Sequence, residues 1–238
     1  MIVNETSDTP TPRGFRSLIP TKAWAALAQH GVRIAHSARD RILHQGETGG
    51  WVLLCLSGRL KVLYAEPDGR ELVLAVRGPG DVIGEFSGRD GGPRSATVQA
   101  IEPGITYKLP DDWFNELVGR FKVSSKLNAY ILGKMRESSA HAWQLAHRSA
   151  ATRLAGFLAA LIDAAGPDHP CPSAIAMSQE ELASGLGLAR SAITPVLADW
   201  KAAGFVRISR GTLHVMDITS LRAVGDADVS SSGQNTAR

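Results

Sequence analysis

The chain has 238 residues, of which 44% are hydrophobic and 21% are charged, and its formal net charge is +3. This is an ordinary globular composition, long enough for two small domains joined by a helix. No apolar run approaches the ~20 residues of a membrane span, so the composition argues against a membrane protein and predicts a cytoplasmic one. The small positive charge is only a hint of a nucleic-acid partner.

The first half of the chain predicts a short helix followed by a β-rich domain. Residues 1–17 lack the apolar core of a signal peptide and are expected to be a disordered lead. Thr21–His30 predicts a short helix that ends at Gly31, which suits a C-cap. From Val32 to Leu109, short β-rich runs alternate with Gly, Pro and Asp turns. That pattern is typical of a small antiparallel barrel or jelly-roll.

A hairpin and a glycine-rich loop stand out inside this β-rich region. Pro67-Asp68-Gly69 is a turn signal between two apolar runs. Residues 84–96 then offer the carboxylate of Glu85, the guanidinium of Arg94 and the hydroxyl of Ser95. A guanidinium and the backbone N–H groups of a glycine-rich turn suit a phosphate, and a carboxylate suits a sugar hydroxyl. The alternative is an ordinary loop with a surface Glu–Arg pair.

A long helix is predicted after the β-rich region. Asp111 begins one helix through Phe121, and residues 124–149 contain no proline and a single glycine. Apolar or small residues recur there in two heptad rows: Asn128, Met135, Ala142 and Ser149, and Ile131, Ser138 and Leu145. The rows predict a coiled-coil seam and hence a homodimer. The alternative is a helix packed on its own β-domain.

Residues 178–216 predict two short helices around a glycine turn, followed by a β-hairpin. Ser178 and Glu181 form a capping box, Gly187 allows the turn and Gly204 ends the second helix. This is the pattern of a helix-turn-helix, with a wing formed by residues 205–208 and 213–216. The alternative is a helical hairpin that binds no nucleic acid.

The predicted DNA contacts lie on this element. They are Ser178, Arg190, Ser191, Thr194 and Arg210. Residues 150–222 hold as many acidic as basic side chains, so DNA binding there depends on local placement of arginines. Pro195 disfavours a continuous helix. One resolution makes Thr194 an N-cap and Pro195 the first helical residue, with Arg190 on the preceding turn.

Three of these motifs together resemble the Crp/Fnr family of bacterial transcription regulators, over roughly residues 18–217. They are Gly84-Glu85, Arg94-Ser95-Ala96 and the adjacent Ser138 and Ser139. The resemblance implies a cyclic-nucleotide site that also includes Phe86. Glu85 would meet the ribose 2′-hydroxyl, Arg94 and Ser95 the cyclic phosphate, and the two serines the base, one of them from the partner subunit.

The resemblance also has departures. Residues 87–91 replace an apolar part of the family's loop, and the loop is one residue shorter. The family's usual Arg-Glu-x-x-x-Arg reading pattern becomes Arg-Ser-Ala-Ile-Thr-Pro at residues 190–195. The operator is therefore expected to differ from that of the cAMP-receptor branch.

We therefore predict an α+β protein in five parts: a disordered lead (1–17), an antiparallel, jelly-roll-like β-roll (18–122), a dimerisation helix (123–150), a winged helix-turn-helix (151–222) and a disordered tail (223–238). The expected effector is cAMP or cGMP, and the expected partners are double-stranded DNA, a second copy and RNA polymerase, with no membrane and no metal. A Crp/Fnr-type regulator with another effector, or none, is one alternative. A cupin-like enzyme is another, but His36 and His44 are too far apart for its metal-binding pair, so no catalytic residue is expected.

Overall fold

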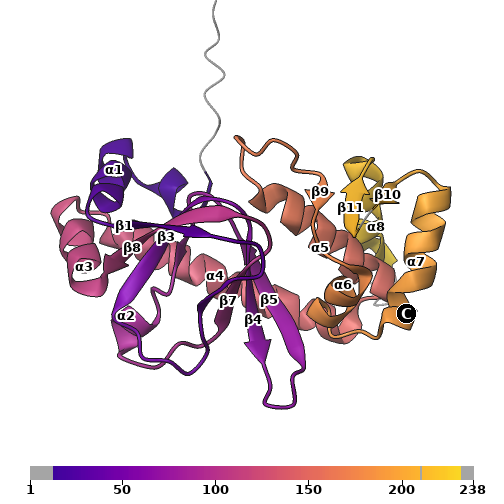
Figure 1. Cartoon of the computed structure of the whole chain (residues 1–238), viewed down its shortest axis with the longest axis horizontal. Coiled ribbons are helices and arrows are strands. Elements are labelled where there is room, and N and C mark those ends of the chain that lie inside the picture. The colour runs from indigo at the N-terminus through magenta and orange to yellow at the C-terminus, as the bar shows by residue number, and fades with distance from the viewer. Residues whose placement is uncertain (1–12, 210, 232–238) are drawn as a thin grey trace, which may run out of the picture.

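A computed structural model describes residues 13–209 and 211–231. A β-rich part lies at one end and a mostly helical C-terminal part at the other, and helix α4 (Ser124–His147) runs between them (Figure 1). The long helix predicted from residue 124 is confirmed, but it ends at His147 rather than at residue 149, because Ser149 is the N-cap of the next helix. No helix of the described residues is both long and apolar enough to cross a membrane.

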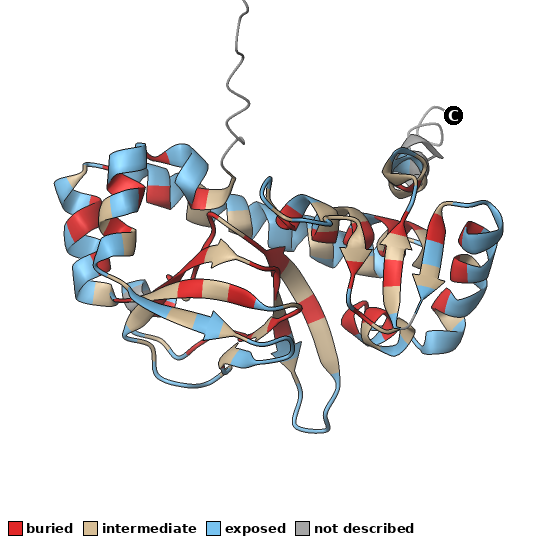
Figure 2. Cartoon of the chain, turned by 45° about the horizontal axis from the view of Figure 1, so that its top comes forward, coloured by how far each residue is buried: buried red, intermediate tan, exposed pale blue. Residues whose placement is uncertain are grey.

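The β-rich part is antiparallel, as predicted, and it consists of two four-stranded sheets. Their strand orders are β1-β8-β3-β6 and β2-β7-β4-β5. The strands are β1 (Val32–His36), β2 (Arg41–Leu43), β3 (Trp51–Ser57), β4 (Leu60–Ala65), β5 (Glu71–Arg77), β6 (Val82–Ile83), β7 (Thr97–Ala100) and β8 (Gly104–Pro110). Apolar side chains such as Leu53, Leu60 and Val98 fill the space between the sheets. The β4–β5 hairpin ends in an exposed loop at the predicted turn (Figure 2).

Helical segments cover the outer face of the first sheet. They are the 3₁₀ helix η1 (Gly14–Leu18) and the helices α1 (Thr21–Gln29) and α3 (Asp111–Arg120), which lie against the N-terminal part of α4. The prediction of a disordered lead is wrong for residues 13–17. Phe15 is fully buried in this core, and Arg13 pairs with Asp81 at 3.0 Å. The rest of the lead, residues 1–12, lies outside the described residues.

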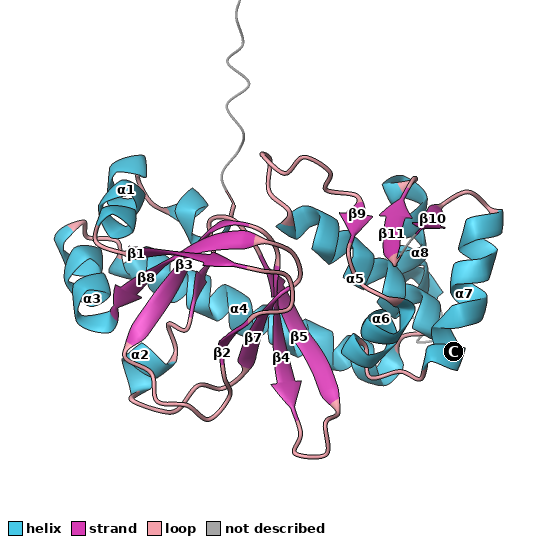
Figure 3. Cartoon of the chain, in the orientation of Figure 1, coloured by secondary structure: helices cyan, strands magenta, loops and turns pink. Residues whose placement is uncertain are grey.

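The C-terminal part packs four helices around a small three-stranded sheet (Figure 3). The helices are α5 (Ala150–Ala164), α6 (Gln179–Gly185), α7 (Arg190–Ala202) and α8 (Ile218–Ser231), and the strands, in the order β10-β11-β9, are β10 (Val206–Ser209), β11 (Thr212–Val215) and β9 (Ala174–Ile175). The prediction of a disordered tail from residue 223 is wrong as far as Ser231, because α8 continues to that residue. Residues 232–238 lie outside the described part.

A β-bulge in β5 controls which side chains face which part of the molecule. Leu63 of β4 pairs with Val73, whereas the preceding Val62 pairs with Ala75, so Leu74 is an extra residue in β5. A bulge interrupts the strict alternation of side chains along a strand. Val73 and Val76 therefore both join the C-terminal core, while Leu74 and Ala75 line a cavity of the β-roll.

A fully buried arginine joins the two parts of the molecule. Arg59, 1% exposed, pairs with Glu102 of the β-roll at 2.5 Å. Its remaining N–H groups donate to three backbone carbonyls of the C-terminal part, those of Leu161, Pro172 and Ala174. We call this group of contacts the Arg59 clasp. Because a buried charge is stable only when it is paired and hydrogen-bonded, the clasp favours this packing of the two parts.

Candidate effector pocket and candidate DNA interface

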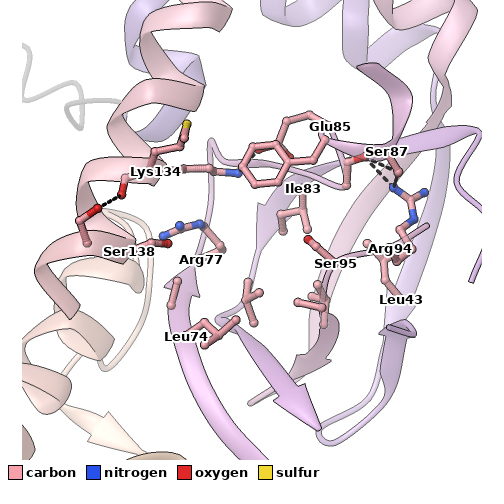
Figure 4. A pocket seen from close by; sticks show the side chains of 18 residues that line it. Leu43, Leu74, Arg77, Ile83, Glu85, Ser87, Arg94, Ser95, Lys134 and Ser138 are labelled. Carbon is pink, nitrogen blue, oxygen red and sulfur yellow. Dashed lines mark hydrogen bonds and ion pairs between the residues drawn. The ribbon is translucent and has the colours of Figure 1, made fainter. Parts of the chain in front are cut away.

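A cavity of about 420 Å³ lies between the β-roll and α4. The structure brings all eight predicted nucleotide-contacting residues to its lining: Gly84, Glu85, Phe86, Arg94, Ser95, Ala96, Ser138 and Ser139. Figure 4 shows Arg94 and Ser87 at one end, Arg77 and Ser138 at the opposite end, and Ser95 between them. We call this cavity the effector pocket, the Arg94 end its cassette end and the Ser138 end its helix end.

Arg94 is a buried positive charge held by neutral groups. It is 4% exposed and donates to the carbonyls of Gly84 and Trp51 and to Ser87 Oγ, each at 2.6 Å. Its Nε has no partner, and no described carboxylate lies within ion-pairing distance. Burial lowers the pKa of the Arg94 guanidinium, while the charges of Asp111 and Glu85 raise it. An anion at this end of the pocket would supply the missing countercharge.

Gly84 is required for this arrangement. Its φ of +84° lies in the left-handed region that glycine alone adopts readily. A Cβ at this position would come within 2.5 Å of Arg94 Nη1. The glycine thus allows the guanidinium to lie directly against the backbone of the loop.

Glu85 is neutralised by a lysine that sequence analysis missed. Lys134 Nζ of α4 donates to Glu85 Oε1 at 2.6 Å and to the carbonyl of Val82 at 2.7 Å. Burial lowers the pKa of Lys134, while Glu85 raises it. The pair removes the repulsion that Glu85 would exert on a phosphate, and it connects the loop to α4. Lys134 precedes Ser138 by one helical turn, a spacing that was the available signal for it.

A second ion pair connects β5 to α4 at the helix end of the pocket. Arg77 Nη1 and Nη2 donate to the two carboxylate oxygens of Glu137 at 2.9 and 2.8 Å. Arg77 is 9% exposed and lines the pocket. Sequence analysis missed Arg77 because its orientation depends on the bulge at Leu74, which carries no clear sequence signal.

The two serines of α4 differ in their hydrogen bonds. Ser139 Oγ donates to the carbonyl of Met135 at 3.1 Å, so its proton is used within the helix. Ser138 forms no hydrogen bond in the described part of the chain, and both serines are exposed. Ser138 is therefore the one whose hydroxyl is free for a ligand.

The exposed apolar face of α4 differs from the predicted seam. Met135, 58% exposed, lies on this face as expected. The other large apolar side chains exposed on α4 are Leu132 and Trp143, which belong to neither predicted row. Ile131 packs against the core of its own β-roll, and Leu145 lines a cavity between β5 and α5. Two of the three residues of the second predicted row, Ile131 and Leu145, therefore face the chain's own domains, whereas the third, Ser138, is exposed. The dimer seam stays a prediction.

The predicted helix-turn-helix corresponds to α6 and α7, and β10 and β11 form the wing. The capping box is confirmed: Ser178 Oγ accepts from the N–H of Glu181, whose carboxylate accepts from the N–H of Ser178. Arg190, Ser191 and Thr194 are exposed on α7. Arg210, the fifth predicted contact, lies outside the described residues.

The alternative start of this helix, with Thr194 as its N-cap, is wrong. Helix α7 begins at Arg190 after the N-cap Ala189, and Pro195 lies inside it. Because proline has no N–H, the carbonyl of Ser191 loses its usual helical donor. Thr194 Oγ donates to the carbonyl of Arg190 at 2.9 Å, so this hydroxyl proton is not free for a DNA contact.

The chain is similar to known regulators over nearly its whole length. Family models match as "Cyclic nucleotide-binding domain" over residues 33–121 and as "Crp-like helix-turn-helix domain" over residues 152–224. The cyclic AMP receptor protein of Thermus thermophilus is 28% identical over 212 residues, 88% of this chain and 95% of that protein. The CRP-like cAMP-activated global transcriptional regulator of Mycobacterium tuberculosis is 25% identical over 206 residues, 85% and 92% of the two chains.

The fold is also shared with solved structures. FixK2 from Bradyrhizobium japonicum has a TM-score of 0.67 at 20% identity, with 82% of this chain and 96% of that chain covered. The protein is thus a transcription regulator that combines a cyclic nucleotide-binding domain with a helix-turn-helix domain, not an enzyme. It belongs to the Crp/Fnr family.

Proposed function

We propose that this regulator binds a purine cyclic nucleotide in the effector pocket and that binding changes its affinity for DNA. The observation that carries the proposal is Arg94, a buried guanidinium without a carboxylate partner in the described chain, beside the exposed hydroxyl of Ser95. A cyclic phosphate matches both groups in charge and hydrogen bonding. Glu85 Oε2 is left to accept from the ribose hydroxyl, since Oε1 accepts from Lys134. The names of two relatives support this class of ligand.

The dimer is part of the same proposal. Leu132, Met135 and Trp143 leave an apolar stripe exposed along α4, and a second copy of α4 would cover it. A nucleotide that contacts Glu85 and Ser138 touches the loop and the helix at once. We propose that it fixes α4 relative to the β-roll and so repositions the DNA-binding helices, a two-state scheme. Because its partner is DNA, we place the protein in the cytoplasm, with RNA polymerase as a further partner.

A ligand screen tests the proposal directly. The melting temperature of the purified protein is measured with cGMP, cAMP and 5′-AMP. A ligand that binds only the native state stabilises it by about 2.7 kcal/mol at 100 times its Kd. A cyclic nucleotide is expected to raise the melting temperature, and 5′-AMP, which lacks the cyclic phosphate, to raise it less. If no cyclic nucleotide changes the melting temperature, the proposal is wrong.

Arg190→Ala is expected to weaken DNA binding. Arg190 is the exposed guanidinium at the start of α7. If it binds guanine O6 and N7, affinity for the preferred site falls by ~1–3 kcal/mol and the base preference there relaxes. If it binds a phosphate, all sequences weaken alike and the salt dependence becomes shallower.

The measurement is a selection from random DNA, followed by anisotropy titrations at several salt concentrations. The control is Lys201→Ala, an exposed cation at the opposite end of the same helix, for which a smaller effect is expected. Unchanged affinity of Arg190→Ala on the selected site would exclude Arg190 from the interface.

A further inference from the structure

The effector pocket has a cationic group at each end. Arg94 lies at the cassette end, and Arg77 lies at the helix end next to Ser138 (Figure 4). If the proposed function holds, the phosphate lies on Arg94 and Ser95. The base, on the opposite side of the ribose, then reaches Arg77 and Ser138. The following inference rests on that binding mode.

Arg77 keeps one edge of its guanidinium free. Its Nη1 and Nη2 each donate to Glu137, and Nη1 also donates to the carbonyl of Val76. Its Nε–H and the second hydrogen of Nη2 have no partner in the described part of the chain. An arginine has five N–H donors and no acceptor. The helix end of the pocket therefore offers donors from Arg77, while the Ser138 hydroxyl can donate or accept.

Purine bases differ at the group that would meet these donors. Guanine presents two acceptors, O6 and N7, which a guanidinium binds with two parallel hydrogen bonds. Adenine presents the N6 amino group, a donor, in place of O6, so one donor of Arg77 and the amino group would face each other unpaired. We propose that Arg77 makes the effector pocket select guanine over adenine, with cGMP as the preferred nucleotide.

Glu137 supports the proposed selectivity by holding the guanidinium of Arg77 in one orientation. Arg77 reaches the pocket side of β5 because the bulge at Leu74 shifts the alternation of side chains. The two bonds to Glu137 then fix the plane of the guanidinium, so little side-chain freedom is lost when a base binds. The alternative is that Arg77 only connects β5 to α4 through Glu137 and makes no contact with the base.

Titration calorimetry on the full chain tests the inference with cGMP, cAMP and cyclic IMP. Cyclic IMP keeps O6 and N7 but lacks the 2-amino group of guanine. Wild type is expected to bind cGMP and cyclic IMP about 5- to 150-fold more tightly than cAMP, the range for one good bidentate contact. In Arg77→Met this ratio should fall to about one. Glu137→Gln, which keeps Arg77, should retain most of it.

The possible results distinguish a failure of the base selectivity from a failure of the proposed function. Binding of cAMP as tightly as cGMP by wild type overturns the base selectivity but leaves the proposed function intact. A selectivity ratio that is unchanged in Arg77→Met removes the role of Arg77, and equal weakening of both nucleotides indicates the purely structural role. Binding of none of the three overturns the proposed function and the inference together. If Arg77→Met fails to fold, Arg77→Lys takes its place, because lysine keeps the charge but not the two parallel donors, and the ratio should again fall toward one.

Discussion

Arg94→Ala is expected to abolish measurable binding of cyclic nucleotides while the protein stays folded. In the free protein Arg94 bonds only neutral groups, so its removal leaves no buried carboxylate without a partner. In the complex it would carry the main attraction to the phosphate. Loss of one side of a buried charged pair costs ~2–5 kcal/mol, which is a drop in affinity of about 30-fold or more. Titration calorimetry measures it.

The matched control is Arg89→Ala. Arg89 belongs to the same loop, in α2 (Ser87–Asp90), but is exposed and does not line the pocket. It should change nucleotide affinity little. Equal affinities of wild type and Arg94→Ala, with a nucleotide that wild type binds, would refute a phosphate at Arg94.

Arg59→Ala is expected to be the most destabilising of the substitutions considered. It would remove the guanidinium that pairs with Glu102, leaving this carboxylate only His169 Nε2 and the backbone N–H of residue 59. It would also remove the donor to three backbone carbonyls of the C-terminal part. Removal of one partner of a buried ion pair costs ~3–5 kcal/mol. Urea unfolding should show this loss in the free energy of unfolding. Limited proteolysis should cleave the loop over residues 165–173 faster than in wild type.

Arg70→Ala is the control for the Arg59 clasp. Arg70 also pairs with a carboxylate, Asp68 at 2.7 Å, but both side chains are more than half exposed. Such surface pairs contribute ~0–1 kcal/mol. If Arg59→Ala loses no more stability than Arg70→Ala, the clasp does not hold the two parts together.

The sequence allowed good prediction wherever a local signal exists. The glycine-rich loop, the capping box at Ser178 and the long helix follow from residue types at short spacing, and all are present. The resemblance to the family also predicted that Ser138 and Ser139 lie at the pocket, and both line it. These features depend on backbone preferences and on neighbours within a few residues.

What was missed depends on contacts between segments far apart in the chain. Lys134 matters because it meets Glu85, 49 residues earlier. Arg59 matters because it meets carbonyls more than 100 residues later. One interpretation of Pro195 placed the start of its helix at this residue, but α7 continues through it, with Ile193 and Leu197 packed in the C-terminal core on either side. In that case tertiary packing outweighs a local preference.

The bulge in β5 has a mechanical consequence. Leu74 and Ala75 line the effector pocket, while their neighbours Val73 and Val76 belong to the core of the DNA-binding part. Gly185 of α6 lies so close to this strand that an added Cβ would come within 2.9 Å of Val73. If a bound base contacted Leu74 and shifted β5, the shift would therefore act on α6 directly, because β5 lies between the pocket and this helix. Under the proposed scheme, signal transmission would need no long relay of residues, because strand β5 borders both the effector pocket and the core of the DNA-binding part.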